Sequence, residues 1–300
     1  MKISICSLCR DSLAKESLYQ SLINCFPNTT EYILIDNSSK KIDCYQALNI
    51  FIDQCNGDYI LVCHDDILFE NLEYEYLLNQ ITKKTKSDPS ASLFGVAGVS
   101  RSNKNIGHFF DAKGERYWGM SEGDLASSLD EFFLVIRKNS GLSVSDGLKG
   151  YHFYGTDLCL NAKEKGLSCY VIDFPVTHYS TGNMNGSFFE ARDDFEKHLQ
   201  KKGLKQFITT TCTVLYGGSN PLKQAWALAL SLDLIERANH IDLEDARKSI
   251  CYRADKRYGK TLFQLLLYII KTRFKIINLF RRFKSDLLWW RKNWRARVAF

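Results

Sequence analysis

The sequence predicts an α/β fold: a parallel sheet covered by helices and followed by a helical extension. Apolar strand-like runs alternate with runs of helical period over the first two hundred residues, which is the pattern of β-α-β units. The run at residues 58–63 is apolar on both faces, as expected for a strand inside a sheet. The chain has 300 residues, 45% hydrophobic and 25% charged, and this suits one large globular domain or one domain plus an appendage.

The first elements follow from hydrophobic period and turn residues. We expect strands at residues 2–7, 31–36 and 58–63, with helices between them at 12–25 and 45–55. Right-handed crossovers would make the three strands parallel, with their carboxyl ends bordering a crevice of nucleotide size.

The middle of the chain has shorter apolar runs, bounded by glycine, proline and polar clusters. In chain order we expect a polar loop at 82–90, a strand at 93–99, a substrate-lining loop at 100–128, a strand at 131–137, a helix at 150–165 and a strand at 168–174.

The pattern changes beyond about residue 205, where helices are expected at 225–238 and 243–256. We therefore divide the chain into a domain at 1–205, a helical extension at 206–260 and a tail at 261–300.

The tail combines an apolar helical face with a basic one. Residues 271–297 hold ten Lys and Arg against one acid, Asp286, so the rest of the chain is mildly acidic. Basic residues interrupt the apolar run, which makes it a poor transmembrane span. A basic amphipathic helix followed by tryptophans predicts an anchor on an anionic membrane surface. The alternative is a helix that packs on its own domain or on another subunit.

Composition also excludes some classes. Basic charge confined to one tail, with no known binding module, predicts no nucleic-acid partner. The N-terminus has no apolar segment of signal-peptide length, and the ten cysteines lie mostly in apolar runs. We therefore expect free thiols and a cytoplasmic protein, peripheral on the inner face of the cell membrane. The Cys6-x-x-Cys9 pair is interpreted as packing because no second pair stands at zinc spacing.

The strand at 58–63 runs directly into His64-Asp65-Asp66. Carboxylates at the carboxyl end of such a strand face the crevice where open α/β sheets bind ligands. Hard oxygen donors there suit a divalent cation, which in turn suits a diphosphate. The alternative is an ordinary acidic turn.

Four segments carry a resemblance to a known family: GYHFYGTDLCL at 150–160, ILIDNS at 33–38, the block at 49–66, and LDEFFLVIRK at 129–138. They resemble, in order and spacing, the motifs of StrF-like glycosyltransferases, which are related to family-2 glycosyltransferases. The resemblance covers about residues 1–190. It implies the GT-A fold, a Rossmann-like mixed sheet covered by helices, and a nucleotide-diphosphate sugar as donor, with a UDP-sugar favoured.

The resemblance also assigns roles around the cation, Mn²⁺ or Mg²⁺. Asp66 stands at the final Asp of the family's metal motif and is assigned to the metal. His64 replaces an acid there and contacts donor or metal, or only caps the strand. Asp65 is expected on the donor sugar or ribose. His178, in a loop that matches the family's, is a candidate metal ligand.

Three further residues are expected to bind the donor. Asp36, at the end of the second strand, is expected to accept hydrogen bonds from the nucleotide's uracil or ribose, and the alternative is a turn-forming Asp-Asn-Ser. Arg10, after the first strand, is a candidate to bind a phosphate or to stack on the base, and Arg101 is another basic candidate near the diphosphate. The loop that holds Arg10 departs from the family's usual sequence.

Transfer with inversion needs a general base for the acceptor hydroxyl. Relatives carry an acidic pattern at the start of the helix at 150–165, of which only Asp157 survives here. Asp157 is the first candidate, although a first-turn carboxylate also interacts favourably with a helix N-terminus. His152, in the preceding loop, is the second.

The leading hypothesis is thus a metal-dependent, inverting glycosyltransferase that acts on a cell-surface glycan or lipid-linked acceptor, as in lipooligosaccharide or polysaccharide biosynthesis. A sugar nucleotidyltransferase is the alternative among enzymes, weakened because residues 7–11 contain no glycine. A catalytically silent, membrane-associated scaffold with the same fold is the third.

Overall fold

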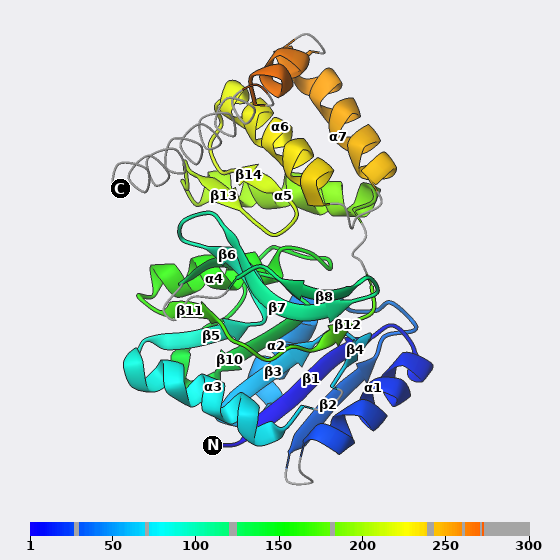
Figure 1. Ribbon diagram of the computed structural model, residues 1–300, viewed down its shortest axis with the longest axis vertical. Helices are drawn as coiled ribbons and strands as arrows, with labels where there is room; N and C mark the ends of the chain where they lie inside the picture. Colours follow the sequence, from blue (N-terminus) through cyan, green and yellow to red (C-terminus); the bar gives the residue numbers. More distant parts are fainter. Residues whose placement is uncertain are drawn as a thin grey trace, which may run out of the picture.

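The computed structural model describes residues 1–26, 30–69, 72–119, 125–180, 184–238, 243–259, 262–270 and 272. Figure 1 shows two parts: an α/β unit that holds the N-terminus, and a mainly helical unit stacked on it. Within the described residues, no helix is long and apolar enough to cross a membrane.

The α/β unit is built on a six-stranded mixed sheet of order β11-β5-β10-β3-β1-β2. Strand β1 is parallel to β2 and β3, as expected from the sequence, whereas β10 runs antiparallel to both of its neighbours. The strands are β1 (Ile3–Cys9), β2 (Glu31–Asp36), β3 (Tyr59–Cys63), β5 (Ala91–Gly95), β10 (Phe133–Arg137) and β11 (Ser168–Val171).

Helices cover both faces of this sheet, and β3 shows why. Its side chains alternate between two cores, with Leu61 in one and Ile60 and Val62 in the other. Both faces are therefore apolar. One core packs against α1 (Ser12–Cys25) and α3 (Tyr74–Ser87), and the other against α2 (Cys44–Gln54) and α4 (Tyr154–Glu164).

Side-chain caps fix where two of these helices begin. The Asp11 carboxylate accepts from the Ala14 N–H at the start of α1, and Asp43 forms a capping box with Gln46 at the start of α2. Both helices return the chain to the edge of the sheet at which β2 and β3 begin.

A second sheet lies between the main sheet and the C-terminal unit (Figure 1), with order β4-β12-β7-β6-β9 and with β8 paired to β7. Its strands are β4 (Ile67–Leu68), β6 (Ala97–Ser100), β7 (Asn105–Asp111), β8 (Gly114–Tyr117), β9 (Ala126–Leu129) and β12 (Thr177–His178).

Two sequence expectations in this region were wrong. The loop expected at 100–128 contains the β7–β8 hairpin and most of β9, because Phe109 is buried between the partly buried His108 and the exposed Phe110 and packs inward on Phe132. The polar loop expected at 82–90 is largely the end of α3. Only Leu77 and Ile81 of that helix are buried, so its apolar stripe is too narrow to predict it.

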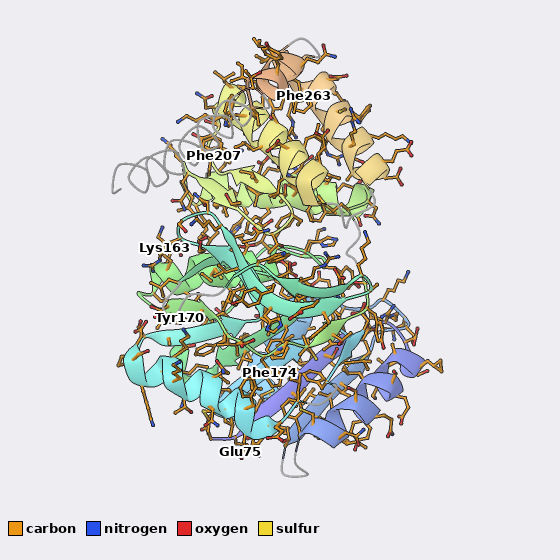
Figure 2. The ribbon with its side chains drawn as sticks, viewed as in Figure 1. Glu75, Lys163, Tyr170, Phe174, Phe207 and Phe263 are labelled. Atoms are coloured by element: carbon orange, nitrogen blue, oxygen red, sulfur yellow. The ribbon has the colours of Figure 1, made fainter. Side chains whose placement is uncertain are left out.

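The C-terminal unit has a core of its own. It contains α5 (Gly186–Lys201), β13 (Phe207–Thr209), β14 (Val214–Tyr216), α6 (Pro221–Ala238), α7 (Leu243–Tyr258) and helical residues 262–270. Helix α5 packs with these later helices in one core. It therefore belongs to the C-terminal unit, although it precedes the expected boundary at residue 205. Figure 2 shows the two cores, with Phe174 in the α/β unit and Phe263 in the C-terminal one.

A buried ion pair ties α5 to the β13–β14 hairpin. Arg192 is fully buried, and its Nη2 lies 3.0 Å from Glu196 Oε1 and donates to the Val214 carbonyl at 2.8 Å. Glu196 also accepts from the Tyr216 N–H at 3.0 Å. These bonds hold the hairpin against the helix, and the hairpin loop at 210–213 faces the α/β unit.

The tail expected to bind membrane lies mostly outside the described residues, which include only 262–270 and 272 of it. In that part Phe263, Leu266 and Ile270 are buried in the C-terminal core. The membrane role of the tail stays a prediction.

Candidate active site

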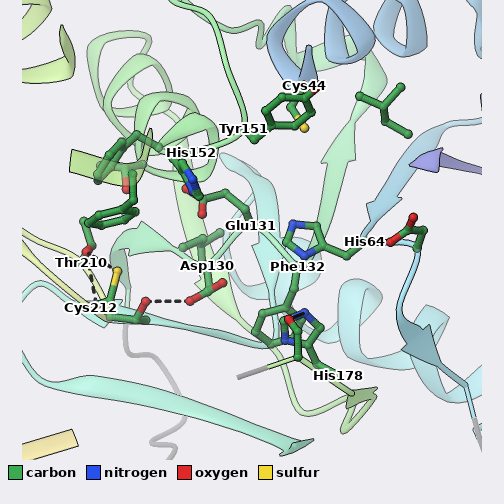
Figure 3. A pocket seen from close by; sticks show the side chains of 18 of the residues that line it. Cys44, His64, Asp130, Glu131, Phe132, Tyr151, His152, His178, Thr210 and Cys212 are labelled. Atoms are coloured by element: carbon green, nitrogen blue, oxygen red, sulfur yellow. Dashed lines mark hydrogen bonds between the residues drawn. The ribbon is translucent and has the colours of Figure 1, made fainter. Parts of the chain in front are cut away.

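A cleft of about 540 Å³ opens between the carboxyl ends of β1 and β3 and the C-terminal unit (Figure 3). This volume is in the range that small-molecule sites occupy. The α/β unit contributes the loops after β1, β2 and β3, and the C-terminal unit contributes the hairpin loop and the start of α5. The cleft therefore lies at the strand ends where the sequence places it.

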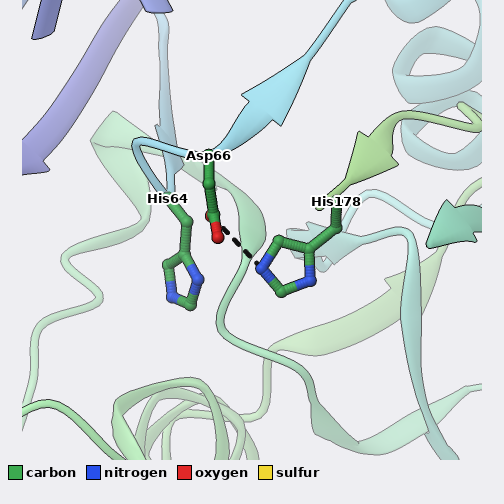
Figure 4. A group of neighbouring side chains, drawn as sticks. All are labelled: His64, Asp66 and His178. Atoms are coloured by element: carbon green, nitrogen blue, oxygen red, sulfur yellow. Dashed lines mark ion pairs between the residues drawn. The ribbon is translucent and has the colours of Figure 1, made fainter. Parts of the chain in front are cut away.

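Three potential metal ligands meet at one side of this cleft (Figure 4). His64 and Asp66 follow β3, and His178 belongs to β12, whose antiparallel pairing with β4 brings it beside them. Their ligand atoms all lie within 4.8 Å of one another. His178 Nε2 is 3.3 Å from Asp66 Oδ1. The structure thus brings together the two expected metal residues and His64.

The ionisation of this cluster suits a cation. Burial, reinforced by His178, lowers the pKa of His64 to about 4, so its ring is neutral at neutral pH. Burial opposes ionisation of Asp66, but the hydrogen bond from His178 and the nearby His64 and Arg10 hold its pKa below the usual range. Neutral imidazole and carboxylate are the forms that bind metals.

Neighbouring side chains orient both imidazoles. His64 Nε2 lies 3.0 Å from Tyr154 Oη. The ring of Phe132 stacks on that of His178, with centroids 4.8 Å apart and planes at 10°. Such outer contacts fix ring orientation at metal sites. Two nitrogens and one carboxylate oxygen fit Mn²⁺ better than Mg²⁺, which prefers oxygen ligands alone.

Two cationic side chains, Arg10 and Lys40, line the described part of the cleft together with these groups. Arg10 Nε and Nη2 donate to the two carboxylate oxygens of Asp65 at 3.0 and 2.8 Å, and its backbone N–H donates at 2.6 Å. Asp65 therefore orients Arg10. Since the guanidinium remains 60% exposed, it keeps a free edge for an anion.

Two of the expected donor residues lie outside the cleft lining. Asp36 is exposed, and its carboxylate accepts a hydrogen bond from the Ser38 N–H at 2.8 Å, as expected for a turn-forming Asp-Asn-Ser. The next residue, Asn37, is buried and lines the cleft. Arg101 is exposed in the turn after β6. The donor roles of Asp36 and Arg101 stay predictions, without support from cleft geometry.

The two candidate bases lie in different environments. His152 lines the cleft, and burial lowers the pKa of its ring. Asp157 is buried in the first turn of α4, where Ser145 donates to it from its N–H and Oγ at 2.6 and 2.7 Å. Asp157 does not line the cleft, so the geometry does not bring it to a substrate. A carboxylate in the first turn of a helix interacts favourably with the helix N-terminus, and this accounts for its buried position.

The cleft contains an acidic pair that sequence reasoning did not single out, Asp130 and Glu131, just before β10. Thr211 Oγ1, in the hairpin loop, donates to Asp130 Oδ2 at 2.6 Å. Burial, with Asp130 adding repulsion, raises the pKa of Glu131 to about 8. Two adjacent acids ahead of an apolar strand were the available signal, whereas Asp65 and Asp66 were identified because they follow one.

Comparison with known proteins adds little to what the geometry of the cleft shows. No protein-family model matches the chain. A protein of Fuscovulum blasticum named "ATP synthase subunits region ORF 6" is 27% identical over 210 residues, 67% of this chain and 84% of that protein. Its name states no activity.

Two solved structures are similar in arrangement. The mannosyltransferase PcManGT from Pyrobaculum calidifontis, in complex with GDP-Man and Mn²⁺, is 12% identical, with a TM-score of 0.43, over 88% of this chain and 84% of its own. A197 from STIV is 10% identical, with a TM-score of 0.34, over 59% of this chain and 81% of its own. At these TM-scores neither likeness supports an argument about function.

Proposed function

We propose that this chain is a glycosyltransferase of GT-A type that moves a sugar, with inversion, from a nucleotide-diphosphate donor to a glycan or lipid-linked acceptor. The observation that carries the proposal is the His64–Asp66–His178 cluster, set at strand ends beside a cleft that also exposes Arg10. A divalent cation and a guanidinium together suit a diphosphate.

The reaction needs charge stabilisation on the leaving group. A cation held by His64, Asp66 and His178 would neutralise the charge that develops on the diphosphate. Arg10, held by Asp65, is aimed before the reaction begins, so its reorganisation cost is small. Lys40 also lines the cleft and would supply a second positive charge.

The other wall of the cleft suits a saccharide acceptor. It combines aromatic rings, including Trp118 and Phe188, with the carboxyl groups of Asp130 and Glu131 and the hydroxyls of the hairpin loop. Ring faces pack on the apolar faces of sugars, and the polar groups bind hydroxyls. The basic tail is proposed to hold the protein at an anionic membrane, where a lipid-linked acceptor would be found.

One observation favours a second function. Two histidines and a carboxylate are also the ligand set of non-haem iron(II) oxygenases. If sugar transfer is correct, Mn²⁺ and a nucleotide sugar stabilise the protein together, whereas an oxygenase would consume O₂ with Fe²⁺ and need no nucleotide.

The experiment is a thermal-shift screen of UDP- and GDP-sugars with and without Mn²⁺, followed by donor hydrolysis. A ligand that binds only the native state raises the melting temperature by mass action. We expect a shift that needs Mn²⁺ and is lost in Asp66→Ala. The control is Asp53→Ala, an exposed carboxylate on α2. No shift with any nucleotide sugar, or equal shifts in Asp66→Ala and wild type, would contradict the proposal.

A sugar nucleotidyltransferase would release pyrophosphate from a nucleoside triphosphate in the same assays. A silent scaffold would show the Mn²⁺-dependent shift without hydrolysis or transfer.

A further inference from the structure

The carboxylate of Glu131 lies at the N-terminal end of α4, inside the cleft. The backbone N–H groups of Phe153 and Gly155 oppose the effect of burial on Glu131 and favour its ionised form. These are among the first N–H groups of a helix, which have no partner within the helix and favour a negative charge. Glu131 is therefore a carboxyl group at a helix N-terminus on the acceptor side of the site, and it lines the cleft.

Glu131 packs against the first turn of α4 at Gly155. A Cβ built on Gly155 would lie 2.5 Å from the Leu129 carbonyl oxygen and 3.4 Å from Glu131 Cγ. No side chain fits at this position without displacing the end of β9, and the glutamate lies at ordinary contact distance from this turn. The first turn of α4 thus sends no acid into the cleft, since Asp157 is bound to Ser145, and the neighbouring strand provides the carboxylate.

Phe153, the residue that precedes the first turn of α4, has an unfavourable backbone conformation. Phe153 has φ 70° and ψ 4°, a left-handed conformation that is uncommon for a residue other than glycine. Its ring packs on Phe188 and stacks on Phe195 of α5, at 5.2 and 5.3 Å between centroids. The C-terminal unit therefore maintains the conformation, as packing does for strained residues at functional sites.

We propose that Glu131 is the general base of the transfer reaction; this rests on the proposed function. The acceptor hydroxyl oxygen forms a bond to the anomeric carbon, and its proton passes to a carboxylate oxygen of Glu131. The bond between the anomeric carbon and the phosphate oxygen breaks, and its electron pair leaves with the nucleoside diphosphate. Asp130, held by Thr211, is a positioning residue for the acceptor.

The competing base is His152, which lines the same cleft. Its ring packs edge-on against Phe188, with centroids 5.1 Å apart, and among the described residues no hydrogen bond orients it. A base is effective when another group fixes its direction toward the proton it removes. Glu131 lies against the first turn of α4 beside Gly155, where the helix N-terminus favours its ionised form, whereas the ring of His152 packs only on aromatic rings. The geometry therefore favours Glu131.

The test separates proton transfer from donor binding. Transfer is measured with Mn²⁺, the donor found in the screen, and octyl β-glycosides of glucose, galactose and N-acetylglucosamine as probes. In Glu131→Gln we expect kcat to fall about 10²- to 10⁴-fold, with the donor-induced thermal shift retained. Glu131→Asp should recover part of kcat. The control is Glu164→Gln, an exposed glutamate at the far end of α4.

The outcomes distinguish the two proposals. If wild type transfers sugar and Glu131→Gln keeps kcat within about threefold, while His152→Ala loses it, the inference is overturned and the proposed function stands. If wild type neither binds nor transfers any donor, both fail. Circular dichroism of Glu131→Gln and Glu131→Asp shows whether a loss is one of folding.

Discussion

The two walls of the cleft hold their charges in opposite ways. On the wall proposed to bind the donor, here called the donor wall, Asp65 faces Arg10 and Asp66 faces His178, so each carboxylate is paired with a basic side chain. On the acceptor wall, Asp130 and Glu131 lie side by side and burial raises the pKa of Glu131. The difference indicates a division of labour: one wall keeps fixed charge for an anion, and the other is suited to take up a proton.

The largest effect is expected from a change of pH, because it changes the ionisation of a group on one wall only. Burial raises the pKa of Glu131 to about 8 from an ordinary 4.5, so folding favours its protonated form. The resulting stabilisation is complete below pH 4.5 and is lost as pH rises through 8. The titratable groups around Glu131 are Asp130, Cys44, Tyr45, Tyr154, Cys159 and Cys212, which include no cation.

Chemical denaturation at pH 5 and pH 9 measures this. Between these pH values the free energy of unfolding of wild type should fall by on the order of 2 kcal/mol more than that of Glu131→Gln. Glu164→Gln should follow wild type. Parallel pH curves for wild type and Glu131→Gln would show that Glu131 is not protonated in the folded protein.

The substitution Arg10→Gln tests the donor wall. It removes the charge facing the diphosphate and leaves Asp65 without its bidentate partner. We expect the donor KM to rise about tenfold, or 1.4 kcal/mol, with a smaller change in the acceptor KM. Arg101→Gln, in an exposed turn outside the cleft lining, is the control. If Arg101→Gln raises the donor KM as much as Arg10→Gln, the predicted role of Arg101 is correct and the cleft geometry is incomplete.

Thr211→Val tests the acceptor wall at nearly constant volume. The hydroxyl that donates to Asp130 is lost, and one hydrogen bond to a charged group is worth about 1.5 kcal/mol or more. The acceptor KM should rise about tenfold or more, while the donor-induced thermal shift is unchanged. Thr209→Val, on the same hairpin, should leave both unaltered. A change in donor affinity would show that the two walls are not independent.

The smallest effect on either wall is expected from removing residues 273–300. This truncation ends after Thr272 because Phe263, Leu266 and Ile270 belong to the C-terminal core. Co-sedimentation with vesicles of phosphatidylglycerol and phosphatidylcholine should be lost, while donor hydrolysis is kept. Vesicle binding that survives the truncation would place membrane contact elsewhere in the chain.

The sequence predicted the donor wall better than the acceptor wall, for a physical reason. Asp66 and His64 directly follow a buried strand, so the period that predicts the strand also predicts where they lie. His178 needed a family motif, because its position depends on pairing between β12 and β4, which join distant parts of the chain.

The acceptor wall depends on contacts that have no local signal. Hydrophobic period predicted α4, although with its start at residue 150 in place of Tyr154, but not that Asp157 accepts hydrogen bonds from Ser145, twelve residues earlier. Likewise, Glu131 packs beside Gly155 in a later helix, and Asp130 is bound by a hairpin some eighty residues away. The helical period of α6 and α7 predicted those helices, but not that α5 joins them.

The buried pair of Arg192 and Glu196 has a consequence for reading mutant phenotypes. It holds the hairpin whose loop carries Thr211, yet neither residue lines the cleft. Removing one partner of a buried pair costs about 3–5 kcal/mol, and partial loosening would release the loop before the unit unfolds. A variant at Arg192 would thus present as an enzyme with poor acceptor affinity, and a genetic screen would assign to the substrate site a residue that never meets the substrate.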